Sequence, residues 1–192
     1  MGIHRLVRNT QYDTIPSHST LYVLRFTFPP EKPMATIQSI VYMPRHEDDY
    51  DRHGPYLRLP LQTAHLIADY GLEGDHKAGA NPNRQLNLIP TDWLAARSAE
   101  GYRTGPGEMG EQLILDGIKM ADMHPGLQLH LGTEAIVELL KTRTGCERLD
   151  ESQPKPIPSE IKLAGIGYLA KIIRSGTIRV GDPVTIQITE PA

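Results

Sequence analysis

The stretch "LQLHLGTEAIVELLKTR", residues 127–143, decides between a helical and a β fold. In its first part, three leucines two residues apart alternate with Gln128 and His130, and a period of two is typical of a strand with one buried face. The second part suits either a helix or a strand by its apolar spacing. The β-branched pair Ile136 and Val137, close after a glycine, favours a strand. We therefore expect two successive strands here.

The same period of two recurs on both sides of this stretch, and a sequence divided by 16 prolines and 17 glycines favours short strands over long helices. The predicted strands lie in "MATIQSIVYMP" (34–44), "RQLNLI" (84–89) and "VTIQIT" (184–189). Together they predict a mainly β protein, built as a β-barrel with one or two short helices.

One helix is clear in the sequence, "TDWLAARSAE", residues 91–100. Thr91 is a favoured N-cap residue, and Asp92 places negative charge in the first turn, where the helix dipole stabilises it. Gly101 follows as a stop signal. The sequence therefore predicts a helix that begins after Thr91 and ends before Gly101.

The composition narrows the class of protein. At 192 residues with 39% hydrophobic side chains, the chain can bury the core of one domain. A net charge of −3 argues against a nucleic-acid binder. Apolar runs do not exceed four residues, so we expect no membrane partner. A single cysteine excludes an internal disulfide, a four-cysteine zinc site and an iron–sulfur cluster, and it predicts a cytoplasmic location.

Residues 1–33 differ from the rest of the sequence. They hold one alternating piece, "TLYVLRFTF", followed by "PPEKP", and a second methionine stands at Met34. We interpret this segment as an N-terminal extension or as the result of a start codon assigned too early, with an arginine-bearing transit peptide as a third option. The main domain is predicted to span 34–190.

The only cysteine, Cys146, lies in "KTRTGCERLD" among the cations Lys141, Arg143 and Arg148. Nearby cations favour the thiolate, which is the nucleophilic and metal-binding form of the side chain. If the preceding residues form a strand, Lys141 and Arg143 share a face that reaches the same pocket. The alternative is a small buried hydrophobe, which is what free cysteine usually is, and the local sequence alone favours that alternative.

Two glycine-bearing segments could hold an anion. "GLEGDHKAG", residues 71–79, presents an acid, an imidazole and an ammonium group in one tight turn, and Arg84 follows closely. In "GPGEMGEQL", Gly107 and Gly110 free the backbone to point N–H groups inward, as anion-binding nests do. A solvated turn and an ordinary loop are the simpler interpretations of either segment alone.

Taken together and in order, these segments resemble the MOSC domain, the module named after the C-terminal part of molybdenum-cofactor sulfurase, in its small stand-alone bacterial form. The resemblance extends from about Met34 to Ile188. It rests on "GLEGDHKAG", Arg84 in "RQLNL", "PGEMGEQL", "HPGLQLHLG", "TRTGCERLD" and "GIGYLAKIIRSGTIRVGDPV".

The resemblance implies a β-barrel-like fold and a cofactor of the molybdopterin type, with Cys146 as a molybdenum ligand or as the carrier of a sulfur atom. Arg143 belongs to the same basic segment and is expected to contact the cofactor. The other cofactor-binding positions that it implies are Gly74, Asp75, His76, Lys77, Arg84, Gly110 and Glu111. The sequence departs from the family pattern at His76, Lys77, Gln112 and Gly145, where arginine, histidine, asparagine and proline are usual.

Two functions follow from this resemblance. The first is a molybdenum-dependent reductase of N-hydroxylated bases or related compounds, which takes its electrons from a separate flavin or iron–sulfur partner. The second is a carrier or binding module in which Cys146 bears a persulfide or holds the cofactor without turnover. A pyridoxal phosphate cofactor is not expected, because the domain that holds it in the full sulfurase has no counterpart here. The sequence leaves the oligomeric state open.

Overall fold

The computed structural model describes residues 35–44, 56 and 58–187, and in this part of the chain the protein is mainly β, as predicted. The described part holds eleven strands, three short α-helices and one 3-10 helix. The strands are β1 Thr36–Tyr42, β2 Leu59–Leu61, β3 Thr63–Ile67, β4 Gly71–Leu72, β5 Leu86–Pro90, β6 Leu113–Asp116, β7 Gln128–Leu131, β8 Ala135–Thr142, β9 Tyr168–Arg174, β10 Gly176–Arg179 and β11 Val184–Gln187.

Eight strands form the main sheet in the order β11-β7-β8-β9-β5-β6-β1-β2, and β10-β3-β4 form a second sheet. All pairs are antiparallel except β5 and β6. The predicted barrel is not closed by a regular ladder. Instead, one bridge joins Thr36 in β1 to Pro183 just before β11, and the Ile37 N–H donates to the Asp182 carbonyl at 2.9 Å. The main sheet thus curves far enough for the start of β1 to meet the chain just before β11.

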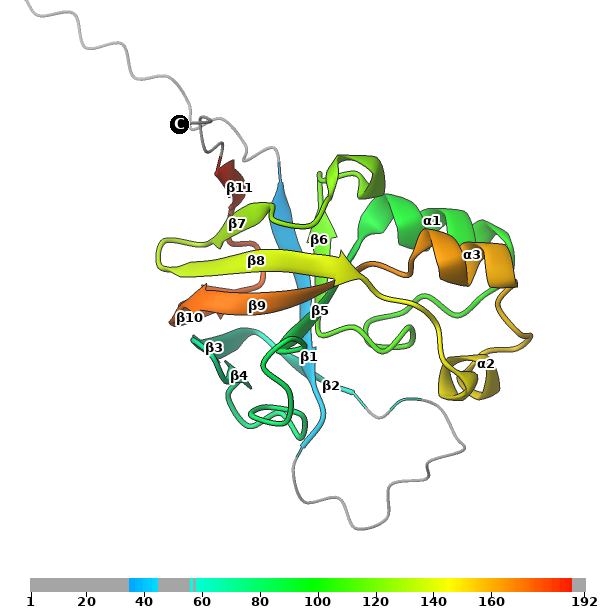
Figure 1. Ribbon diagram of the computed structural model, residues 1–192, viewed down its shortest axis with the longest axis horizontal. Helices are drawn as coiled ribbons and strands as arrows, with labels where there is room; N and C mark the ends of the chain where they lie inside the picture. The colour runs from blue at the N-terminus through cyan, green and yellow to red at the C-terminus, as the bar shows by residue number, and fades with distance from the viewer. Residues whose placement is uncertain (1–34, 45–55, 57, 188–192) are drawn as a thin grey trace, which may run out of the picture. The chain divides into compact units, whose positions relative to one another are not determined.

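The stretch that decided the fold class forms the hairpin β7–β8, as predicted. The two strands pair antiparallel with Leu129 opposite Val137, and both of these side chains are fully buried. The ambiguous second half is strand because its inward side chains enter the core between the sheets, where a helix would expose half of them. β8 ends at Thr142, and from there the chain leaves the middle of the main sheet toward α2 (Figure 1).

The alternation in "RQLNLI" does not mark one solvent face, because every residue of β5 is buried. Its outer face is covered by a second apolar cluster that includes Ile89 and Leu94. The buried polar side chains bond to backbone instead of water: Gln85 Oε1 accepts the Ile172 N–H at 2.8 Å and Asn87 Nδ2 donates to the Gly110 carbonyl at 3.0 Å. The side-chain amides of Gln85, just before β5, and Asn87 therefore fix the position of β5 against β9 and against the loop before β6.

Helix α1, Thr91–Ala99, connects the parallel pair β5 and β6, as such pairs require. It ends before Gly101, whose φ of 85° is the left-handed stop that was predicted. The predicted N-cap is wrong by one residue: Pro90 caps the helix, and the Thr91 hydroxyl donates to Asp116 at 2.8 Å.

Two further helices, α2 Glu147–Ser152 and α3 Ser159–Ala164, exceed the predicted one or two. Each is six residues long, too short for a helical period to show in the sequence. In Figure 1, α1 and α3 lie beyond the end of β8 and the start of β9, on the side where the chain leaves the main sheet after β8. Among the described residues, no helix is long and apolar enough to cross a membrane.

Some sequence predictions fall outside the described residues. These are the extension 1–33 with its alternating piece, and Ile188 at the end of the last predicted strand.

Candidate functional site

A pocket of about 470 Å³ lies where the end of β8 meets the turn after β4 and the loop before β6. Lys77 and Arg84 enter it from the turn, Arg143 from the end of β8, and Gly110 from the loop. Cys146 completes this set at the start of α2. The fold therefore brings together five of the residues that the sequence singled out, from segments far apart in the chain.

Arg143 is the buried cation of the pocket, with 6% of its surface exposed. Its backbone N–H donates to the Gly167 carbonyl at 2.9 Å and its carbonyl accepts the Ile166 N–H at 2.7 Å, which fixes the residue beside β9. Nη2 donates to the Met109 carbonyl, but Nη1 is buried without a hydrogen-bond partner among the described residues. Burial lowers the pKa of Arg143, yet an arginine stays charged at neutral pH. A buried positive charge with an unused donor faces this pocket.

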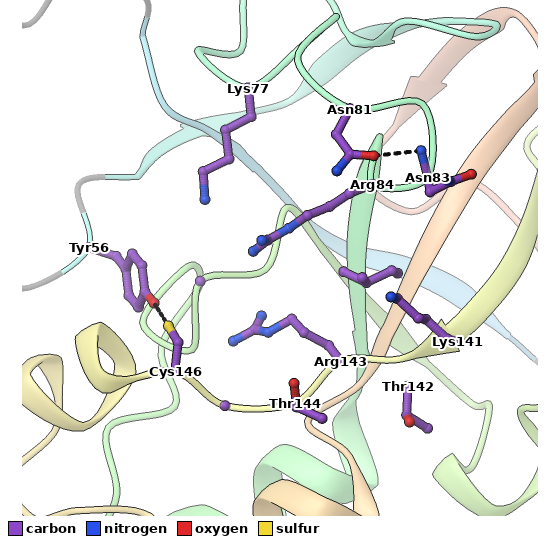
Figure 2. A pocket seen from close by; sticks show the side chains of 13 residues that line it. Tyr56, Lys77, Asn81, Asn83, Arg84, Lys141, Thr142, Arg143, Thr144 and Cys146 are labelled. Carbon is purple, nitrogen blue, oxygen red and sulfur yellow. Dashed lines mark hydrogen bonds between the residues drawn. The ribbon is translucent and has the colours of Figure 1, made fainter.

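Lys77 and Arg84 face the same space. Figure 2 shows the charged ends of Lys77, Arg84 and Arg143 pointing toward one another across the pocket. Burial lowers the pKa of Lys77 to about 8, and repulsion from Arg58, Arg84 and Arg143 adds to this shift. The depressed pKa is the expected result of partly burying an ammonium group beside other cations.

Asp75, predicted as a cofactor contact, is fully buried behind the pocket lining. It accepts the Met43 N–H at 3.0 Å and the Lys77 N–H at 2.8 Å, and Arg58 Nη1 lies 3.7 Å from its carboxylate. These contacts tie the turn to the end of β1. Asp75 thus sets the direction of Lys77 and does not itself line the described pocket.

Gly74 and His76 flank this aspartate and are exposed, outside the described pocket lining. Gly74 has a φ of 80°, which the tight turn requires. The His76 N–H donates to the Met43 carbonyl at 2.7 Å. The turn as a whole is built as predicted, but of its four predicted residues only Lys77 lines the pocket in the described part of the chain.

The glycine loop is folded on itself and does not form the predicted anion nest. The Gly107 N–H donates to the Glu111 carboxylate, and the Gly110 N–H donates to the Gly107 carbonyl at 2.8 Å. Glu111 is fully buried, and burial raises its pKa. Glu111 therefore holds the loop from inside, and Gly110 alone of the loop lines the pocket within the described residues.

Cys146 is exposed, so it is not the buried small hydrophobe that local sequence favoured. Its backbone caps α2, where its carbonyl accepts the Leu149 N–H at 2.9 Å. The Tyr56 hydroxyl lies 3.8 Å from its sulfur (Figure 2), with either atom able to donate. Burial and the neighbouring Cys146 raise the pKa of Tyr56 to about 12, so its phenol stays protonated at neutral pH.

Sequence reasoning missed Tyr56 and Arg58. The Arg58 side chain is 2% exposed, bonds the Gly110 carbonyl at 3.4 Å and reaches Asp75, so it joins the loop to the turn. Tyr56 packs its ring against Gly110 and under the Arg148 guanidinium, 4.9 Å away. Tyr56 and Arg58 stand two residues apart in "PYLRLP", residues 55–60, so an extended chain would place them on the same face. This spacing is a weak signal, and the sequence offers no stronger one.

The chemistry of the pocket follows from its lining. Four basic side chains line it, and its described lining holds no Asp or Glu. The described residues also contain no group of three or more His, Cys, Asp or Glu placed to hold a metal ion. A metal bound by Cys146 would therefore have to arrive with most of its own ligands. The site suits an anionic ligand that reaches one thiol.

The family model for the MOSC domain matches residues 75–185, more than half of the chain. The chain belongs to the MOSC domain family, as the sequence motifs predicted. Members of this family in general bind the molybdenum cofactor. No curated protein matches the sequence.

Solved structures share the fold at low sequence identity. YuaD from Bacillus subtilis aligns with a TM-score of 0.62 at 14% identity, over 81% of this chain and 97% of its own. YiiM from Geobacillus stearothermophilus gives 0.60 at 18%, over 80% and 75%. YiiM from Escherichia coli gives 0.55 at 18%, over 81% and 71%. The chain thus spans about two thirds to three quarters of its longer structural relatives.

Proposed function

We propose that this protein binds a cofactor of the molybdopterin type in the cationic pocket and reduces N-hydroxylated bases or related compounds, with Cys146 as a molybdenum ligand. One observation carries the cofactor part of the proposal: Arg143 is buried at the pocket with a donor that has no partner among the described residues. A buried guanidinium donor without a hydrogen-bond partner is costly, and an anion that accepts from it removes that cost.

The residues present fit the cofactor's chemistry. A molybdopterin carries a phosphate, for which Arg143 and Arg84 offer forked donors and Lys77 a point charge. It also brings sulfur ligands for its metal, and a cysteine thiolate is a soft ligand of the same kind. The lack of a His, Cys, Asp and Glu cluster in the described part agrees with a metal that arrives already held by its own ligands.

The chain's own residues would bind and orient. Arg143, Arg84 and Lys77 hold the phosphate, and Tyr56 keeps the Cys146 side chain directed into the pocket through its 3.8 Å contact. When bound, the cofactor supplies two-electron chemistry at an N–O bond. In the overall reaction, R–NHOH takes up two electrons and two protons and yields R–NH2 and water. The electrons come from a separate flavin or iron–sulfur protein.

The test is the metal and pterin content of the full chain, expressed with cofactor synthesis intact. We expect about one molybdenum and one pterin per chain in the wild type, and loss of both in Arg143→Met. Arg179→Met, an exposed arginine of β10 outside the pocket, is the matched control and should load fully. Reduction of an N-hydroxylated base with a supplied electron donor should follow the molybdenum content. Full loading of Arg143→Met would refute the proposed cofactor site.

A carrier function is the second candidate, and the exposure of Cys146 favours it. An exposed thiol can accept a sulfur atom from a donor protein, which a buried ligand cannot do. A carrier would show sulfane sulfur on Cys146 and no turnover of N-hydroxylated compounds. A reductase would show stoichiometric molybdenum and turnover, so one preparation distinguishes the two.

A further inference from the structure

The pocket holds more positive charge than one phosphate needs. A phosphate monoester carries a charge of about −1.5 to −2 at neutral pH. The pocket lining offers four basic side chains and no carboxylate among its described residues, although the buried Asp75 and Glu111 behind the lining act on Lys77 and Arg143. The phosphate of one molybdopterin balances about two of the four cations. Arg84 and Lys141 are exposed in the lining and are available to a second anionic group.

The electrostatics of Lys77 support this surplus. Burial is the largest cause that lowers the pKa of Lys77 to about 8; repulsion from three arginines adds to the shift, and the buried Asp75 beside it opposes the shift. Arg84 likewise contributes to lowering the pKa of Arg143. These smaller electrostatic contributions agree with the charged ends of Lys77, Arg84 and Arg143 pointing into one space in Figure 2.

The fourth cation is placed apart from the other three. Lys141 approaches from the far side of Arg143 in Figure 2, in the same part of the view as Asn83. The β8–β9 pairing shifts its register between Leu139 and Lys141, and such bulges re-aim side chains at the ends of strands. Asn81 accepts the Asn83 N–H at 2.9 Å, which fixes the turn that brings the Asn83 amide to the pocket.

We propose that Lys141 and Asn83, next to Arg84 in the pocket lining, form a second anion subsite that binds a phosphate group distinct from the one held by Arg143, Arg84 and Lys77. This inference rests on the proposed function for the first phosphate. A second phosphate has two chemical sources. It belongs either to a cofactor whose pterin carries a nucleotide through a diphosphate, or to a substrate whose N-hydroxylated base is part of a nucleotide.

The experiment is calorimetric titration of the full chain with pyrophosphate and with inorganic phosphate. Pyrophosphate offers two linked phosphate groups, one for each subsite, whereas we expect inorganic phosphate to fill the Arg143 subsite first. We expect Lys141→Gln to weaken pyrophosphate binding about tenfold and phosphate binding by less than twofold. Asn83→Ala should act in the same direction with a smaller loss. The control Lys119→Gln removes one exposed charge outside the pocket and should change neither.

Equal losses for both probes, or no loss for either, would overturn the second subsite. The source is then identified by mass spectrometry of the extracted pterin and by titration of loaded protein with AMP and adenosine. A nucleotide on the pterin assigns the subsite to the cofactor. A plain pterin phosphate with Lys141-dependent binding of AMP, and none of adenosine, assigns it to the substrate.

The two proposals fail in different ways. A chain that never contains pterin but binds pyrophosphate through Lys141 refutes the proposed function and keeps the subsite. A chain that is loaded with pterin, but in which Lys141→Gln has no effect on the binding of any probe, keeps the proposed function and refutes the second subsite.

Discussion

Two charged regions lie on either side of Cys146, and they are built in opposite ways. On the pocket side, the described lining holds four basic residues and no acidic one. On the α2–α3 side, Lys162 bonds the Asp150 carboxylate, which also accepts the Ile157 N–H at 2.9 Å. Burial raises the pKa of Asp150, but these two hydrogen bonds outweigh it and lower the pKa below its ordinary value.

The difference separates charged groups that are paired within the fold, as in the α2–α3 corner, from charged groups that remain available to a ligand, as in the pocket. In the α2–α3 corner, the carboxylate closes a short loop and has its partners in the protein. In the pocket, Arg143 has a buried donor unused by the described residues, and Lys77 has lost much of its affinity for a proton. Changes in the corner should therefore alter stability, and changes in the pocket should alter binding.

The strongest test of this separation is Arg143→Met, which keeps much of the side-chain volume and removes the charge. We expect phosphate affinity to fall about 100-fold, because a forked, charge-assisted contact is lost at a buried position. The melting temperature of the ligand-free protein should change little, because the loss of the hydrogen bond to the Met109 carbonyl is offset by the removal of a buried donor that has no partner among the described residues. Calorimetry and thermal unfolding measure the two effects. A large drop in melting temperature would make Arg143 a structural residue like Asp150.

The reverse test is Asp150→Ala in the corner. It leaves Lys162 unpaired and the Ile157 N–H without its acceptor, at a cost of about 2 kcal/mol in the free energy of unfolding. For a domain of this size, this is about 4–8 °C in melting temperature. Phosphate affinity should remain within about twofold of the wild type. A collapse of binding in this variant would show that the two regions are not independent.

The pH dependence of stability sharpens the comparison at Lys77. Its pKa is about 8 in the folded protein and 10.5 ordinarily, so the unfolded chain holds its proton to a higher pH. The free energy of unfolding should therefore rise as pH increases from about 8 towards 10.5, by about 1–2 kcal/mol after allowance for solvent screening.

The control for this measurement is Lys77→Met, which removes this contribution while other titrating groups remain. Denaturant unfolding of both proteins between pH 7 and 10.5 isolates the difference. If the free energy of unfolding changes with pH equally in both proteins, the Lys77 ammonium group is solvated and is not affected by burial or by the three arginines.

The smallest effect on stability is expected for Cys146→Ser. An exposed side chain that changes by one atom should alter the free energy of unfolding by less than about 0.5 kcal/mol. Bound molybdenum or persulfide, and the reduction of N-hydroxylated bases, should be lost in the same variant. A protein that is destabilised yet fully active would contradict the role given to this thiol.

The sequence predicted the parts of the fold that depend on local pattern. The β7–β8 hairpin followed from three alternating leucines and two β-branched residues, and α1 from its acidic first turn and Gly101. The short helix after Cys146 could not be predicted, since six residues do not complete two turns. The complete burial of β5 depends on an apolar cluster from distant segments, which no local window contains.

For the candidate site, the order of the motifs in the sequence predicted one shared site. The structure places five of its residues in one pocket lining: Lys77, Arg84, Gly110, Arg143 and Cys146. Whether these residues bind a cofactor stays a prediction. Asp75 and Glu111 were expected to contact the ligand, but both lie buried behind the pocket lining, where they accept hydrogen bonds from backbone N–H groups. The sequence alone does not distinguish such a carboxylate from one that faces a ligand. Arg58 was missed because its two partners come from segments distant in the chain.

The bridge between Thr36 and Pro183 bears on how the protein is synthesised. β1 leaves the ribosome early, but the Ile37 N–H finds its acceptor only when Asp182 has been added. β2 pairs the far part of this edge of β1, from Ile40 to Tyr42, as soon as it is made, but the first residues of β1 wait for the end of the domain. A nascent chain stalled before the final strand should therefore expose a short unpaired edge to other chains, and synthesis of the last strand should cover it.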